Sequence, residues 1–330
     1  MTFIAWPRRR LLAVGATALA APAALAQTTS TAPWPNRPLR LVITFAPGGS
    51  TDLIGRLVAR GLQDRLGQPV IVENRAGAGG TVATAHVAQA APDGYTMVLS
   101  NSTVMAIGPA LYRSVTYDPM RDFTHVALLT TNHLVFVANN RFPARRLEDL
   151  VRLSRQREGG LDMASSGSGS LNHMLITRFA NLSGAKLNHV AYRGAGPAMT
   201  AVIGGEVPLM SDSLPSAAAH LRQQSVRPIA VAGESRSTSF PDVPTFREQG
   251  FDIVSMGWFG LSMPAGVPEP VVERVNRETR AVLADAEVRS RLAEFDSIPG
   301  NMAAPEFTAL VRQQFELWAP LVRASGATAD

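Results

Sequence analysis

From residue 34 onward, short apolar runs alternate with longer segments that carry apolar residues at helical spacing. Residues 38–45 are predicted to form a buried strand, and residues 51–66 an amphipathic helix that ends at Gly67. A strand at 70–72, a helix near 81–91 and a strand at 95–100 follow. This alternation of strand and helix predicts an α/β fold with a mostly parallel sheet.

The middle of the chain repeats the alternation. Two strand segments are expected at 126–129 and 134–137, separated by the polar residues 130–133. The remaining expected elements are a helix at 147–156, a strand at 161–164, a helix at 171–182, a strand at 188–192, a helix ending at 203, strands at 207–211 and 228–232, and helices at 269–283 and 305–323.

These elements group into two α/β units. We predict a domain I made of residues 34–130 plus 253–330, and a domain II made of residues 131–252. The chain would then cross between the domains twice. A doubly connected pair of α/β domains is typical of binding proteins that close about a hinge, with the ligand in the cleft between the domains.

The N-terminus has the pattern of a secretory signal peptide. Three arginines at 8–10 precede the apolar residues 11–25, and Ala24 and Ala26 supply the small residues of a cleavage site. An apolar stretch of about 15 residues is shorter than the roughly 20 that a membrane-spanning helix needs. We predict that residues 1–26 are cleaved near Ala26 and that the mature protein is exported to the periplasm.

Composition and charge exclude several functions. The chain has no cysteine, which excludes disulfides, thiolate metal ligands and a lipid anchor on an N-terminal cysteine. The formal charge of +5 falls to 5 − 3 = +2 once the three arginines of the predicted signal are removed. Lys186 is the only lysine, and no dense basic tract with interleaved aromatic residues occurs, so nucleic-acid binding is not expected.

A glycine-rich turn follows the first predicted strand. Gly48 and Gly49 allow a tight bend, and Ser50 is placed to cap the next helix. The first amides of a helix lack intrahelical partners and lie at the positive end of its dipole, so an anion fits there. Ligands of open α/β sheets also bind outside the carboxyl ends of strands. A strand–helix connection that binds no ligand would show the same sequence pattern, so this alternative stays open.

Comparable polar turns follow later strands of both units, at 100–102, 165–170 and 192–197. Because all of them lie at strand carboxyl ends, we expect them to converge on one cleft. Hydroxyls, amides and backbone N–H groups without a strong base suit recognition better than reaction. Asp52 and Asp212 lie beside these turns, where each either caps a helix, orders a water or holds a ligand ammonium group.

Signatures of enzymes are missing from the sequence. Ser166 stands where a G-x-S-x-G motif needs its first glycine, and Val82 stands where a dinucleotide-binding motif needs its last. The six histidines contain no H-E-x-x-H pair. We predict no catalytic residue, no metal site and no cofactor. A secreted hydrolase or isomerase with a triad formed only in space is the alternative from this class.

Six motifs in a fixed order resemble a known family. They are WPNRP at 34–38 running into FAPGGSTD at 45–52, VENR at 72–75 with GAGG at 77–80, APDGYT at 91–96, YRG at 192–194, FPDVPT at 240–245, and WFG at 258–260 with PAG at 264–266. In this order they resemble the Bug family, the periplasmic receptors of tripartite tricarboxylate transporters. The resemblance spans essentially the whole mature chain.

The resemblance implies a type II periplasmic binding protein fold that closes on its ligand. It also implies that main-chain groups of the facing turns hold a ligand carboxylate, partly through ordered waters. The implied residues are Phe45, Ala46, Gly48, Gly49 and Ser50 in the first domain, and Ser166, Ser168, Tyr192, Gly194, Ala195 and Asp212 in the second. Asp52 and Asn101, from the polar turns described above, complete the predicted site.

The ligand and the partner follow from the same resemblance. We expect a small carboxylate, which is a dicarboxylate, a tricarboxylate, an amino acid or an aromatic acid. The expected partners are the membrane permease subunits of a tripartite transporter, and the receptor itself is expected to be a monomer. A periplasmic sensor that presents its closed form to a signalling protein would use the same capture step, so it stays an alternative.

Overall fold

The computed structural model describes residues 33–324, so the predicted signal peptide lies outside the described residues. The chain divides into two units, Met1–Pro33 and Trp34–Asp330, and the described helices and strands all belong to the second. Among the described residues, no helix is both long enough and apolar enough to cross a membrane.

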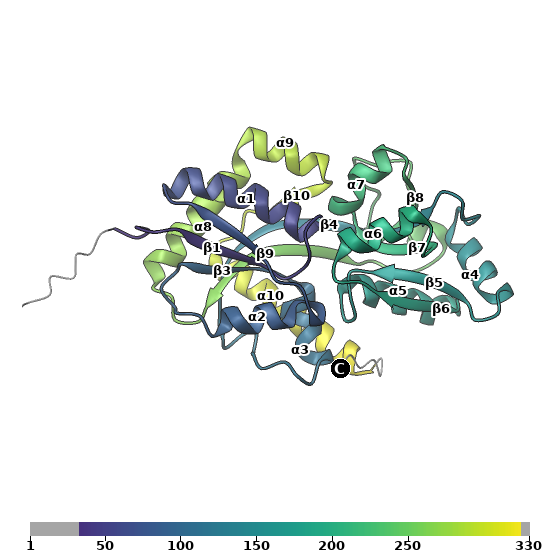
Figure 1. The fold of residues 1–330 in the computed structure, drawn as a ribbon, viewed down its shortest axis with the longest axis horizontal. Helices are drawn as coiled ribbons and strands as arrows, with labels where there is room; N and C mark the ends of the chain where they lie inside the picture. The colour runs from purple at the N-terminus through teal and green to yellow at the C-terminus, as the bar shows by residue number, and fades with distance from the viewer. Residues whose placement is uncertain (1–32, 325–330) are drawn as a thin grey trace, which may run out of the picture. The chain divides into compact units, whose positions relative to one another are not determined.

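One half of a continuous sheet is built from both ends of this unit (Figure 1). Its first elements are β1 (Leu39–Ile43), α1 (Ser50–Leu66), β2 (Val70–Asn74), η1 (Ala78–Gly80), α2 (Thr81–Ala88), β3 (Thr96–Asn101), η2 (Thr103–Ile107) and α3 (Gly108–Leu111). Its last elements are β9 (Met256–Pro264), α8 (Glu269–Ala284), α9 (Ala286–Glu294), β10 (Ser297–Pro299) and α10 (Ala304–Ala324). We call this half, together with the start of β4 (Phe123–Asn139), the first lobe.

The other half is built from the middle of the chain. Its elements are α4 (Leu147–Gln156), β5 (Leu161–Ser165), α5 (Leu171–Ser183), β6 (Leu187–Ala191), α6 (Ala195–Gly204), β7 (Leu209–Ser213), α7 (Leu214–Arg222), β8 (Val226–Val231) and η3 (Arg247–Gln249). We call this half, together with the end of β4, the second lobe. The strand order across both lobes is β2-β1-β3-β9-β4-β7-β5-β6, and β8 and β10 also pair with β4.

Parallel pairing sets the positions of the polar turns. In the first lobe β1 pairs in parallel with both β2 and β3, so the turns after these three strands lie at one edge of the sheet. In the second lobe β5 pairs in parallel with β6 and β7, which gathers the turns after those strands in the same way. Each lobe therefore presents a set of strand carboxyl ends.

The long strand β4 joins the lobes and corrects one expectation. The polar residues 130–133 do not interrupt two short segments but lie inside one strand of 17 residues. Up to His133 the strand pairs with β9 of the first lobe, and from Leu134 it pairs with β7 and β8 of the second. The polar residues occupy the place where the strand leaves one set of partners for the other. The domain boundaries near 130 and 252 stay a prediction.

The sheet is mixed rather than mostly parallel. The strand β9 was not expected, and it runs antiparallel to β3 and to β4. The strand β9 contains glycines instead of an unbroken run of β-branched residues, so its sequence does not look like a strand. Two of these glycines, Gly257 and Gly260, leave space that packing requires. A Cβ on Gly260 would lie 2.1 Å from Cζ of Phe307, and one on Gly257 would lie 2.9 Å from Nδ2 of Asn132.

An aromatic cluster anchors the core of the second lobe. Phe136 of β4 is fully buried, and its ring packs edge-on against Phe179 and Phe246, with centroids 5.5 Å and 4.9 Å apart. Edge-to-face pairs of this kind add to the stabilisation gained from apolar burial.

We expect Phe136→Ala to lower the free energy of unfolding by about 3–5 kcal/mol, because it leaves a cavity among rings that cannot collapse into it. Urea denaturation measures the change. Leu182→Ala is the control, since Leu182 is 56% exposed and a surface truncation should cost less than about 0.5 kcal/mol. Equal effects of the two substitutions would contradict this view of the core.

Candidate ligand-binding site

A cavity lies where the strand ends of the two lobes face each other. The centre of a water molecule can occupy about 60 Å³ of this cavity, and this volume corresponds to about four to six water molecules. It is lined by Phe45, Gly49, Ser50, Thr51, Asn101, Ser102, Thr103, Asn132, Leu134, Ser166, Leu171, Asn172, Ala195, Ser213, Gly257, Trp258 and Phe259. These described lining residues include no Arg, Lys, His, Asp or Glu, so the wall is polar but uncharged.

Four helices begin at the cavity wall. The first residues of α1, α5 and α6 line it, as does Ser213, the N-cap of α7. The helices α1 and α6 start from glycine N-caps, Gly49 and Gly194, and no side chain of the described residues caps either one. A Cβ built on Gly49 would lie 3.3 Å from Cβ of Ala195, so these two helix ends face each other closely. Their first amides and dipoles create a positive potential without a charged side chain.

Hydroxyls of the first lobe cap helices of the second. Ser50 Oγ accepts from the backbone N–H of Ser216 in α7 at 3.1 Å and lies 2.8 Å from Oγ of Ser213. Thr103 Oγ1 accepts from the backbone N–H of Leu171 in α5 at 3.1 Å. These contacts satisfy helix amides across the lobe boundary, so the lobes are in direct contact around the cavity.

Six of the predicted site residues line the cavity, and the others lie behind or beside it. The lining residues are Phe45, Gly49, Ser50, Asn101, Ser166 and Ala195. Ala46, Gly48, Asp52, Gly194 and Asp212 are not among the lining residues, and Ser168 and Tyr192 line a separate outer pocket. A role of these thirteen residues in ligand binding stays a prediction. The seven residues outside the cavity wall do not contact the cavity as described.

The carboxylate of Asp52 holds the first turn in place. Asp52 Oδ2 accepts from the backbone N–H of Gly48 at 3.1 Å, and Oδ1 accepts from Nε of Arg56 at 2.9 Å and from Nδ2 of Asn74 at 3.0 Å. Burial alone would raise the pKa of Asp52, but these hydrogen bonds outweigh it and hold the pKa below its ordinary value. Asp52 is thus an ionised support for the glycine turn.

Ser168 and Tyr192 belong to an outer pocket of about 350 Å³ that shares Phe45 and Ser166 with the cavity. The glycine-rich residues 77–80 form another part of its wall. The Tyr112 hydroxyl donates to the backbone oxygen of Ser168 at 2.5 Å, which joins the lobes on this side as well.

Sequence analysis missed several residues of the cavity wall. The most informative are Asn132, Asn172 and Trp258, because each has a buried polar side-chain atom with no hydrogen-bond partner among the described residues, as Asn101 and Ser102 of the predicted turn 100–102 also do. Such atoms are rare in native proteins unless something else satisfies them. The tryptophan of the WFG motif was the one available signal.

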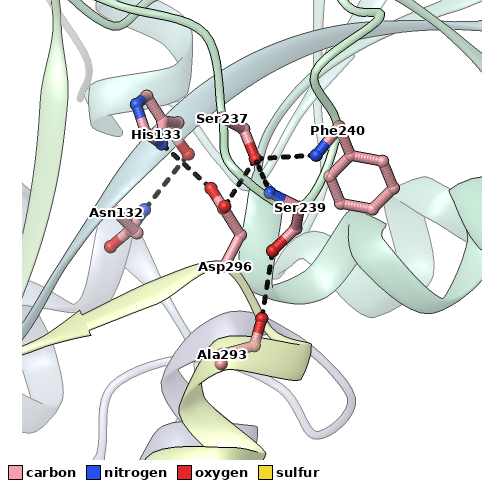
Figure 2. A network of polar contacts seen from close by, with 7 residues as sticks. All are labelled: Asn132, His133, Ser237, Ser239, Phe240, Ala293 and Asp296. Carbon is pink, nitrogen blue, oxygen red and sulfur yellow. Dashed lines mark hydrogen bonds and ion pairs between the residues drawn. The ribbon is translucent and has the colours of Figure 1, made fainter.

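A polar network also joins the lobes next to the cavity (Figure 2). Asp296, between α9 and β10, accepts from His133 Nδ1 at 2.9 Å and from the hydroxyl of Ser237 at 2.5 Å. Ser237 lies between β8 and η3, and its hydroxyl oxygen also accepts from the backbone N–H groups of Ser239 and Phe240. The crossing strand therefore carries Asn132 at the cavity and His133 in this network.

Comparison with known proteins supports the predicted family. A sequence profile described as the tripartite tricarboxylate transporter family receptor matches residues 54–327. The chain belongs to this family. It is therefore a solute-binding receptor of the tripartite transporter type, as its motifs predicted.

Three relatives illustrate the likeness. Protein BugT of Bordetella pertussis is 35% identical over 320 residues, covering 96% of this chain and 98% of BugT. The structure of MatC from Rhodopseudomonas palustris with bound malate is 33% identical with a TM-score of 0.84, covering 88% of this chain and 100% of MatC. An R. palustris protein solved with adipate is 29% identical with a TM-score of 0.86, covering 90% of this chain and 99% of that protein. These likenesses confirm the two-domain α/β fold of periplasmic binding proteins.

Asp212 gives the site region a pH-dependent stability. It is fully buried in β7, and burial raises its pKa to about 7 against hydrogen bonds from Ser216 and Ser213. Between about pH 4 and pH 7 the native carboxyl keeps its proton while the unfolded one loses it. The native state then binds more protons, so stability falls as the pH rises through this range.

We expect Asp212→Asn to remove this dependence. Relative to the variant, the wild-type protein should lose a free energy of unfolding on the order of a few kcal/mol between pH 4 and pH 7. Urea unfolding at a series of pH values measures the difference. Parallel stability curves for the two proteins would mean that Asp212 titrates as it does in the unfolded chain.

Proposed function

We propose that the protein captures a small carboxylate in the cavity between its lobes and delivers it to the membrane permease subunits of a tripartite transporter. The observation that carries this proposal is the meeting of two helix N-termini, those of α1 and α6, at one cavity, with no side-chain cap on either among the described residues. A carboxylate there would accept hydrogen bonds from helix amides and complete both ends. The relatives solved with malate and adipate favour the same ligand class.

The uncharged wall favours this proposal over binding of a cation or an apolar molecule. No acidic side chain of the described residues lines the cavity to balance a cation, whereas dipoles of four helices favour negative charge. An apolar molecule would leave the side-chain N–H donor of Asn101, which lines the cavity, without a partner.

Ligand capture on this proposal shifts the protein toward the form in which the lobes touch. The ligand contacts residues of both lobes, so it binds the closed form better than an open one, and that difference in affinity drives closure. The crossing strand β4 and the segment between β8 and β9 are the proposed hinge, near the predicted domain boundaries. We further propose that the receptor acts as a monomer in the periplasm.

A pair of side chains that resembles a catalytic pair, Ser165 and His189, does not support a hydrolase. Ser165 Oγ lies 2.6 Å from Nε2 of His189, which resembles a nucleophile–base pair. Ser165 is completely buried and absent from the cavity wall, and burial, together with the neighbouring His173, lowers the pKa of His189 to about 4. No carboxylate of the described residues orients His189, so the pair lacks the third member of a triad.

A thermal-shift screen of the mature protein against small carboxylates, with neutral analogues as controls, tests the proposal. A ligand at about 100 times its dissociation constant adds roughly 2.7 kcal/mol to the stability of a protein that binds it only when folded. We expect a shift with carboxylates alone. If neutral analogues shifted the melting temperature as much, recognition of a carboxylate would be wrong.

The variant Gly49→Val tests whether the ligand binds at the facing N-termini of α1 and α6. Gly49 has φ −90°, which valine adopts without strain, but its side chain would meet Ala195 across the cavity. We expect at least about 100-fold weaker ligand binding by calorimetry, with the melting temperature of the free protein little changed. Gly204→Val is the matched control, because a Cβ there meets nothing within 4 Å. Unchanged affinity in folded Gly49→Val would refute the placement of the ligand.

A further inference from the structure

A segment of the first lobe runs from the cavity wall to the second lobe. Residues 101–112, which we call the strap, comprise the last residue of β3, Ser102, the π-helical turn η2, the helix α3 and Tyr112. Asn101 and Thr103 at the start of the strap line the cavity. Short π-helical turns are rare and often occur at functional sites. The strap therefore links the cavity wall to the contacts that Tyr112 makes at its other end.

Both ends of the strap form hydrogen bonds with the second lobe. At its start, Thr103 Oγ1 accepts from the backbone N–H of Leu171 at 3.1 Å. At its end, the hydroxyl of Tyr112 donates to the backbone oxygen of Ser168 at 2.5 Å. Burial raises the pKa of Tyr112 above its usual value, so the hydroxyl keeps its proton and remains a donor at neutral pH. Both bonds would be lost if the lobes separated on this side.

The apolar side chains of the strap are buried together with those of the second lobe. Ile107, Leu111 and Tyr112 belong to the same buried cluster as Leu171 and other residues of α5. A Cβ built on Gly169, in the turn between β5 and α5, would lie 2.2 Å from Cδ2 of Leu111 and 3.1 Å from Cε2 of Tyr112. The glycine leaves the space that these two side chains fill, so the strap fits closely onto the second lobe.

Opening of the lobes would therefore meet a resistance that involves no ligand atom. Separation of the strap from the turn 165–170 would return the apolar surface of Leu111 to water. It would also exchange the protein acceptor of the Tyr112 hydroxyl for water. Contacts within the protein alone thus favour the form in which the lobes touch.

We propose that Tyr112 is a positioning residue, which latches the strap to the second lobe and keeps a fraction of the protein closed before any ligand binds. The inference rests on the proposed function, because the latch matters for transport only if the closed form retains a carboxylate. A ligand that binds the closed form alone gains apparent affinity in proportion to the closed fraction. Tyr112 thus strengthens binding without contacting the ligand.

Spin labels on the two lobes measure the closed fraction of the full mature protein. The chain has no cysteine, so Thr116→Cys in the first lobe and Asn181→Cys in α5 give two unique labelling sites. Both residues are exposed. Double electron–electron resonance then gives the distribution of distances between the labels in ligand-free protein. We expect two populations in the wild-type background, one at the separation of the closed structure and one at a longer distance.

The variant Tyr112→Phe keeps the ring and removes the hydroxyl. We expect the ratio of closed to open protein to fall by about threefold to tenfold, the effect of one neutral hydrogen bond. Tyr117→Phe is the matched control, because the hydroxyl of Tyr117 also donates to a backbone oxygen at 2.5 Å, that of Val104, but both residues lie in the first lobe. It should lower the free energy of unfolding in urea, as Tyr112→Phe does, and leave the ratio unchanged.

Several results would overturn the latch. A wild-type protein that is entirely open without ligand would do so, and so would an unchanged distance distribution in Tyr112→Phe. An equal fall of the ratio in Tyr117→Phe would point to a general loosening of the first lobe instead. Should Tyr112→Phe fail to fold, Leu111→Ala decides, because it removes the side chain that fills the space beside Gly169. An unchanged ratio in that variant would contradict a closing role of the strap.

The thermal-shift screen of the unlabelled protein separates this inference from the proposed function. Shifts with carboxylates, together with an unchanged distance distribution in Tyr112→Phe, would overturn the latch and uphold the capture of a carboxylate. No shift with any carboxylate, together with the expected fall of the ratio, would uphold the latch and overturn the proposed ligand.

Discussion

The two lobes meet through their backbones, because glycine occupies the positions at which a side chain would hold them apart. A Cβ on Gly196 would lie 2.6 Å from the backbone oxygen of Pro47, and one on Gly194 would lie 3.1 Å from the nitrogen of Ala46. The Ala46 nitrogen instead donates to the backbone oxygen of Arg193 at 3.2 Å. Closure of the cavity, the facing helix ends and the capping hydroxyls of Ser50 and Thr103 all depend on this close approach.

Helix ends rather than charged side chains suit a receptor that must release its ligand. A buried ion pair requires desolvation of two charges, and breaking it leaves one of them buried alone. Amides at a helix N-terminus are already oriented and carry only partial charge, so an anion gains hydrogen bonds without an opposite full charge to abandon when it leaves. The ionised Asp52 and its bonds to Arg56 and Asn74 then act one layer behind the cavity, where they hold the turn without repelling the ligand directly.

The parts of the site that were predictable from sequence are those that depend on backbone shape. Two adjacent glycines between an apolar run and a helical pattern indicated the turn of Gly48 and Gly49, because few other residues allow that bend. Asn132 gave no such signal, and Trp258 was marked only by its place in the WFG motif. Asn132 stood in a polar stretch that suggested a break between strands, and Gly257 and Gly260 made β9 look unlike a strand. Both strands depend on packing against distant partners, such as Phe307 under Gly260, and pattern along the chain does not contain that information.

The crossing strand also explains why polar residues occur in the middle of a buried sheet. Asn132 and His133 are successive residues, yet one lines the cavity and the other bonds Asp296, which also holds Ser237 of the second lobe. A change of backbone angle at this point on opening would move both side chains, because they share one peptide unit. The cavity wall at Asn132 and the lobe contact at His133 are therefore mechanically linked. An apolar pair at these positions would fill the same space, but it would offer no polar atom to the cavity and no hydrogen bond to Asp296.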